Sequence, residues 1–319
     1  MKLTYRGSDN ELISSITNIV KSKTSYTFTL NNLKRNRVYH LEKVELVDNN
    51  TTTPFPKLDN ITNSFIVERT EAVNISGIEE LENRNPNNLN KTVVKISLID
   101  ADNVLDANEV VNISYNNNKI VHGTVKVQNK NKYIEAVFND LVLNEDTVIK
   151  SINFANKPSK AGENIGINKT DNKIYDNVIN TNKSLIINNN FKLVGPTVNT
   201  QITKEANQKT NITFDLDVNI NPKIANTLRF KAKFRATNGE FVETNIVSGS
   251  SITTVNSKQK INFNLTNLKT NQIYTLIELY YLPNSNNNIV DTNKVKKDAN
   301  VSRTILVNKG STIISKYGE

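Results

Sequence analysis

The sequence predicts an all-β protein made of tandem β-sandwiches of the immunoglobulin or fibronectin type III kind. Apolar and polar residues alternate with a period of two in many short segments, whereas apolar residues at helical spacing are rare. Turn-forming residues separate these segments roughly every 8 to 12 residues, as in sandwich domains. In addition, one phrase of the sequence occurs twice, as FTLNNLKRNRVY at 28–39 and as FNLTNLKTNQIY at 263–274.

A third, weaker copy of this phrase lies between the other two. In EAVFNDLVLNEDTVIKSINF, Leu141 falls on Leu33 and Leu268, while Thr147 replaces the tyrosine of the other copies. The copies are 108 and 127 residues apart, which is the length of a domain and longer than a solenoid repeat. We therefore expect these three leucines to be buried at equivalent places in three sandwiches.

Each copy predicts a strand, a turn and a second strand. In the first copy, SYTFTL alternates before the Asn- and Lys-rich turn, and VYHLEKVELV follows it. In the second strand of every copy the apolar series slips by one residue, between Leu41 and Val44 in the first copy. A β-bulge produces such a slip, so we expect one in each domain.

The last third of the chain carries the fullest set of predicted strands. With the two strands of the phrase, seven segments alternate and no convincing helix appears, which predicts one complete sandwich. The other five segments lie at 191–198, 211–220, 227–236, 241–247 and 303–308. Strands SFIVER at 64–69 and SLIIN at 184–188 follow the other two copies.

These repeats predict the domain organisation. We expect an incomplete sandwich over residues 1–70, two sandwiches over 71–190 and 191–308, and the start of a further unit or a tail at 309–319. The first domain lacks two strands because its beginning, KLTYR, aligns with KAKFR in the middle of the third. The chain is accordingly expected to be a piece of a longer repeat protein or the product of a gene eroded at its ends.

The phrase resembles the junction of the last inner strands in fibronectin type III domains. The resemblance implies that Leu33, Leu141 and Leu268 plug the core beneath the turn. It also implies that Tyr39 and Tyr274 form tyrosine corners, with each hydroxyl bonded to the backbone a few residues upstream.

The repeat units also resemble a bacterial family. Asn- and Lys-rich units without Cys or Trp, with the pattern L-x-N-L-K-x-N-x-x-Y-x-L, are similar to the repeat domains of unknown function in large surface proteins and lipoproteins of Ureaplasma and related mollicutes. The similarity is strongest at 26–46 and 261–281. It implies an extracellular, cell-surface location, no enzyme activity, and membrane attachment only through an anchor outside this chain.

The composition of the 319 residues excludes several kinds of chemistry. There is no Cys, which excludes disulfides and thiol catalysis, and the 10 Gly are too dispersed for a phosphate-binding loop. The 2 His do not recur between the repeats, so no catalytic residue, metal site or cofactor is predicted. The 56 Asn are scattered, which indicates an AT-rich genome better than a prion-like segment.

One acidic segment is a weak candidate for calcium binding. Asp100, Asp102 and Asp106 in DADNVLDANE offer oxygen ligands at close spacing. However, Val104 occupies a ligand position of the EF-hand pattern, and the glycine of that pattern is missing. A polar turn between strands is the preferred interpretation.

The net charge of +9 is unevenly distributed, with +3 in residues 1–70, −2 in 71–190 and +8 in 191–319. Much of the excess lies in LRFKAKFRA, whose alternation puts four cations on one sheet face: Arg229, Lys231, Lys233 and Arg235. Such a stripe could attract a sulfated glycan, an anionic lipid or nucleic acid, or could be an ordinary solvated face. Nucleic acid is disfavoured because the strand places no aromatic residue among these cations on the same sheet face.

The sequence thus predicts a monomeric, non-catalytic repeat region of a bacterial cell-surface protein. It would act as a spacer, adhesin or surface antigen, contacting a host-surface protein or a sulfated glycan by many weak contacts. The alternatives are an accessory region of a large surface enzyme and a glycan-binding module.

Overall fold

The computed structural model describes residues 1–7, 10–20, 22–35, 37–48, 51–55, 64–67, 70–154, 167–168, 173–174, 178–181, 185–195, 201–204, 209–283, 293–297, 303–308 and 311–316. In these residues the regular structure is almost entirely strand, which confirms the all-β prediction. The helical elements found there are the single turns α1 (Pro222–Ala225) and η1 (Gly249–Ser251).

The chain divides into two compact units. The first unit contains Met1–Glu79, Lys95–Ala136 and Val148–Leu185, and the second contains Glu80–Val94, Val137–Thr147 and Ile186–Glu319. The predicted domain boundaries at 70/71 and 190/191 are not decided by this division and stay a prediction.

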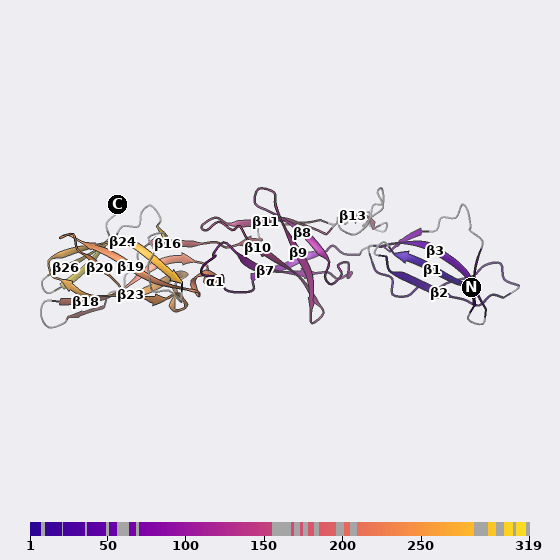
Figure 1. Cartoon of the computed structure of the whole chain (residues 1–319), viewed down its shortest axis with the longest axis horizontal. Helices are drawn as coiled ribbons and strands as arrows, with labels where there is room; N and C mark the ends of the chain where they lie inside the picture. The colour runs from indigo at the N-terminus through magenta and orange to yellow at the C-terminus, as the bar shows by residue number, and fades with distance from the viewer. Residues whose placement is uncertain are drawn as a thin grey trace. The chain divides into compact units, whose positions relative to one another are not determined.

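The second unit contains two facing sheets (Figure 1). One has the order β22-β23-β18-β16-β25, with β17 paired to β18; the other has the order β20-β19-β24-β26-β27, with β21 paired to β19. The strands of the first sheet are β16 (Phe191–Gly195), β17 (Gln201–Lys204), β18 (Lys209–Ile220), β22 (Thr253–Val255), β23 (Lys258–Lys269) and β25 (Lys296–Lys297). Those of the second are β19 (Leu228–Ala236), β20 (Phe241–Glu243), β21 (Val247–Ser248), β24 (Gln272–Pro283), β26 (Arg303–Asn308) and β27 (Ser311–Lys316).

The inner faces of these two sheets form one core. Alternate residues of β18, β19, β23 and β24 are buried, as the period of two requires. The rings of Phe214 on one sheet and Phe234 on the other meet edge to face, with centroids 5.5 Å apart. Taken in chain order, the strands have the two-sheet arrangement of an immunoglobulin-like sandwich, which confirms the predicted fold class.

A larger sheet has the order β14-β11-β8-β9-β10-β7-β6. Its strands are β6 (Asn74–Glu80), β7 (Thr92–Ile99), β8 (Val110–Tyr115), β9 (Lys119–Gln128), β10 (Asn131–Phe138), β11 (Thr147–Asn153) and β14 (Val178–Asn180). Three two-residue strands complete this region of the chain: β12 (Ile167–Asn168), β13 (Lys173–Ile174) and β15 (Ile186–Ile187).

Strand β9 switches partners at Gly123. Its first half pairs with β8, and its second half pairs with β10. A Cβ added at Gly123 would lie 2.5 Å from Cγ2 of Ile134 and 3.0 Å from Cδ1 of Ile113. Only glycine fits this crossing, where side chains from both neighbouring strands close over the backbone.

The first residues of the chain form a separate sheet in the first unit, with the order β2-β1-β3-β4 and β5 paired to β3. Its strands are β1 (Lys2–Gly7), β2 (Leu12–Ile16), β3 (Arg37–Asp48), β4 (Thr51–Pro54) and β5 (Ser64–Val67). These strands correspond to β19, β20, β24 and β26 of the complete sandwich, with β4 as an added hairpin partner of β3.

All three expected bulges are present. In each repeat, one residue of the strand after the phrase has no partner across the ladder, and the register shifts there. These residues are Glu42 in β3, Lys150 in β11 and Ile277 in β24. Their spacing equals that of the repeated phrase, so the period slip in the sequence was a correct signal of the bulge.

Two expectations for the first repeat are wrong. The segment SYTFTL carries no strand, and Leu33 is half-buried instead of buried. In the second unit the equivalent strand, β23, pairs along the whole of β18. No described strand before residue 68 occupies the place of β18, so among the described residues SYTFTL has no neighbouring strand to pair with and Leu33 has no opposing sheet.

Asparagine provides most of the turn geometry in the described chain. Thirteen non-glycine residues have positive φ, and eleven of them are Asn. Asn tolerates the left-handed region better than other residues with a side chain because its short amide bonds to the local backbone. Near the C-terminus, β27 pairs with β26, so residues 311–316 form an edge strand of the sheet that also contains β19 and β24.

Candidate functional site, a buried arginine network and a cationic sheet face

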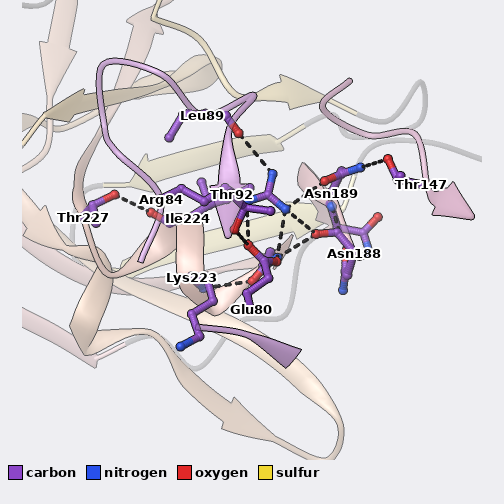
Figure 2. Close-up of polar contacts among 12 residues, drawn as sticks. Glu80, Arg84, Leu89, Thr92, Thr147, Asn188, Asn189, Lys223, Ile224 and Thr227 are labelled. Carbon is purple, nitrogen blue, oxygen red and sulfur yellow. Dashed lines mark hydrogen bonds and ion pairs between the residues drawn. The ribbon is translucent and has the colours of Figure 1, made fainter. Parts of the chain in front are cut away.

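The second unit contains an arginine with no exposed side-chain surface. Arg84 lies in the loop between β6 and β7 (Figure 2). Its Nε and Nη2 donate to the two carboxylate oxygens of Glu80 at 2.9 and 3.1 Å. Its Nη1 donates to the carbonyl oxygen of Leu89 at 3.1 Å. This two-pronged geometry is the strong form of an arginine–carboxylate pair.

The same guanidinium contacts the segment that precedes β16. Nη2 of Arg84 lies 3.1 Å from the carbonyl oxygen of Asn188 and 2.8 Å from Oδ1 of Asn189. The amide of Asn189 in turn donates to the carbonyl of Glu145 at 2.8 Å and to Oγ1 of Thr147 at 2.9 Å. Three segments far apart in the sequence therefore meet around one cation.

Helix α1 completes the network. Asn221 caps the helix by accepting from the backbone N–H of Lys223 at 2.8 Å, and Pro222 begins it. The amide nitrogen of Asn221 donates to Glu80 at 2.5 Å and to the carbonyl of Asn188 at 2.6 Å. The backbone N–H of Arg84 donates to the carbonyl of Lys223 at 2.7 Å.

The environment of Glu80 keeps its carboxylate ionised. Burial, the largest influence, raises the pKa of Glu80, but the hydrogen bonds from Arg84, Thr92 and Asn221 and the charge of Arg84 together hold the pKa below its usual range. The hydroxyl of Thr92 donates to Oε2 of Glu80 at 2.6 Å. We name the set Glu80, Arg84, Thr92, Asn189 and Asn221 the Arg84 network.

The Arg84 network was not predicted from the sequence. In the structure, strand β6 ends at Glu80 and Arg84 follows in a loop. A glutamate four residues before an arginine was the available signal, but it usually marks an exposed helical pair. Burial of the pair depends on Asn189 and Asn221, which are more than 100 residues away in sequence.

The acidic segment 100–109 is a loop in the first unit that is held by hydrogen bonds of its own carboxylates. Asp100 accepts from the backbone N–H groups of Val104 and Leu105 at 2.8 and 2.9 Å and from Nζ of Lys132 at 2.7 Å. Lys132 also donates to the carbonyl of Leu105. Both carboxylate oxygens of Asp100 thus accept hydrogen bonds from the loop backbone, and one of them also accepts from Lys132.

The other two candidate carboxylates bind residues near the first sheet. Asp102 accepts from Thr70 and Glu71 and lies 3.2 Å from Nε of Arg35. Asp106 lies 3.1 Å from Nη2 of the buried Arg37. In the part of the chain that the structure describes, no group of three acidic, His or Cys residues is placed to hold a metal ion. The calcium hypothesis for Asp100, Asp102 and Asp106 therefore finds no support.

The predicted corner residues occupy the ends of the phrase. Leu141 and Leu268 are buried, at 2% and 0% exposure. The hydroxyl of Tyr39 accepts from the backbone N–H of Lys34 at 2.8 Å, five residues upstream. The hydroxyl of Tyr274 does the same with Lys269 at 2.8 Å. In the middle copy the corner position is occupied by Thr147, whose hydroxyl accepts from the Arg84 network.

Replacing Tyr274 by phenylalanine should destabilise the second unit by about 0.5–1.5 kcal/mol, because the hydrogen bonding of the hydroxyl to the backbone of Lys269 is lost while the ring is kept. Urea unfolding followed by circular dichroism measures the change. Tyr133→Phe is the control, since Tyr133 is half-buried and its hydroxyl has no hydrogen bond in the described chain. Equal stability of wild type and Tyr274→Phe would show that the hydrogen bonding of the Tyr274 hydroxyl does not contribute to the stability of the second unit.

The four predicted cations alternate with buried residues on β19, as expected. Their surroundings differ from the prediction in two ways. Lys231 forms an ion pair with Glu243 on β20, so the stripe is not free of carboxylates. An exposed aromatic residue, Phe241 of β20, also lies on this face, beside Lys233 and Arg235. The sequence pattern of β19 alone could not reveal either neighbour.

The chain was compared with family models, curated proteins and solved structures. No family model matches the chain, and no curated protein matches it. The chain resembles the crystal structure of the FN1–FN3 domains of chicken CNTN1. The match covers 97% of this chain and 90% of the CNTN1 chain, with 11% sequence identity and a TM-score of 0.25. None of the described helices is long and apolar enough to cross a membrane.

Proposed function

We propose that this chain is a non-catalytic spacer region of a bacterial cell-surface protein and that it is located outside the cell. The cell-surface location is supported by the resemblance of the repeat units to mollicute surface repeats. The spacer role is supported by the tandem sandwich-type repeats and, above all, by the Arg84 network.

Within the second unit, the Arg84 network stiffens the passage from the second to the third predicted repeat. The predicted boundary at 190/191 lies one residue after Asn189, and both Asn188 and Asn189 accept from Arg84. A connection held by flexible polar residues would bend freely. Here the segment before β16 is hydrogen-bonded to a buried ion pair and to α1, so bending it would leave charged groups without partners in the interior.

The first repeat uses the same kind of contact. Arg37 at the end of the first phrase is buried and donates to the carbonyl of Val104 at 3.1 Å and to Asp106. Val104 and Asp106 lie in the loop between β7 and β8, which corresponds to α1 between β18 and β19. In each case a buried arginine donates a hydrogen bond to a carbonyl of the segment between these two strands. The two arginines come from different places in their repeats.

Small-angle X-ray scattering tests the spacer role. The wild-type chain should give a narrow distribution of end-to-end dimensions. The double variant Glu80→Gln/Arg84→Met, which removes both charges without leaving one unpaired, should broaden that distribution while circular dichroism shows that the strand content is kept. The matched control is Arg6→Met/Glu42→Gln, which removes an exposed ion pair and likewise leaves the net charge unchanged. Equal distributions for wild type and Glu80→Gln/Arg84→Met would contradict a stiff spacer.

A further inference from the structure

Phe241 is a large apolar side chain left on the surface between two cations. It lies on the edge strand β20, directly opposite Arg235 of β19, and 56% of its surface is exposed. Nζ of Lys233 lies 4.5 Å from the centre of its ring, and Cζ of Arg235 lies 5.9 Å from it. Both positive groups are therefore close to the ring on the outer face of the sheet.

These two cations have no carboxylate partner in the described chain, whereas the nearby acids have other partners. Glu243, opposite Lys233 on β20, pairs with Lys231. Glu278, opposite Lys233 on β24, lies 3.8 Å from Nζ of Lys294. The attraction of Lys233 and Arg235 for an external anion is thus not cancelled locally, and the C-terminal region from residue 191 carries +8 in total.

The chemistry of this surface matches a sulfated sugar. The C–H face of a pyranose ring can pack on the exposed ring of Phe241, while sulfate oxygens accept from the ammonium of Lys233 and the forked guanidinium of Arg235. Single-stranded nucleic acid is less well matched, because binding it usually takes several aromatic platforms in a row. Tyr280, in register with Lys231, is 5% exposed and offers no second platform.

We propose that Lys233, Arg235 and Phe241 form a binding site for a sulfated glycan on the outer face of β19 and β20. The site is independent of the spacer role, because none of its residues belongs to the Arg84 network. Compared with the four-cation stripe expected from the sequence, it omits the paired Lys231 and adds an aromatic residue from the neighbouring strand.

Binding of heparin to the whole chain tests this proposal. In a titration at low ionic strength, Lys233→Gln/Arg235→Gln should weaken heparin binding roughly tenfold or more, because two charge-assisted contacts are lost. Phe241→Leu should also weaken binding while keeping both charges, since the flat ring is lost. The control Lys130→Gln/Lys258→Gln removes the same charge from exposed positions elsewhere and should have a much smaller effect.

Three results would overturn the proposal. If both double variants weaken binding equally, heparin responds only to net charge. If Phe241→Leu binds like the wild type, the ring has no part in the site. If oligo-dT competes with heparin at equal charge concentration and depends more strongly on Phe241, the site is one for nucleic acid. Circular dichroism of each variant confirms that the fold is kept, which is expected because all three side chains point away from the core.

Discussion

Replacing Arg84 by methionine is expected to lower the free energy of unfolding of the second unit by about 3–5 kcal/mol. The change removes a side chain without exposed surface and leaves the carboxylate of Glu80, whose side chain is 10% exposed, without its cation. It also leaves the oxygens of Leu89 and Asn189 without the donors that satisfy them. Urea unfolding followed by circular dichroism measures the loss.

Two controls separate the buried charge from the lost volume. Arg84→Met combined with Glu80→Gln should recover part of the stability, because the unpaired carboxylate is removed together with the cation. Arg6→Met removes an exposed ion pair with Glu42 and should change stability little. A similar loss for Arg6→Met and Arg84→Met would show that the burial of Arg84 contributes nothing.

The same network should make stability depend on pH. Because the folded-state pKa of Glu80 lies below its usual value, its stabilising effect is complete above the unfolded-state pKa of about 4.3 and is lost as the pH falls through the lower folded-state pKa. Wild type should therefore lose more stability on acidification from neutral pH than Glu80→Gln/Arg84→Met does. Parallel pH profiles for the two proteins would mean that Glu80 has no part in acid unfolding.

Replacing Leu268 by alanine should cost about 2–5 kcal/mol, because a fully buried side chain is removed and a cavity remains between the two sheets. The sequence provides an internal control. Leu33→Ala changes the equivalent leucine of the first copy, which is only half-buried, and should cost distinctly less. Urea unfolding of the two variants compares one residue of the phrase in two environments, and equal losses would contradict the difference in burial.

The sequence was sufficient for the features that depend on neighbours in the chain. Alternation predicted the strands of the second unit, and the period slip located the bulges at Glu42, Lys150 and Ile277. The phrase also predicted where Tyr39 and Tyr274 lie relative to their turns. Each of these features follows from a local rule, namely the period of two of a strand or the geometry of a turn.

Only the tertiary structure decided the features that depend on distant partners. SYTFTL alternates like a strand but forms none, because a strand needs a neighbour to bond to and no strand described before residue 68 takes the place of β18. The same limit applies to Arg84, which is buried by residues more than 100 positions away, and to Phe241, which joins the cations of β19 only through strand pairing. Local sequence determines which residues can form a strand or a charged face, whereas the partners brought by the fold determine whether the strand forms and what the charges meet.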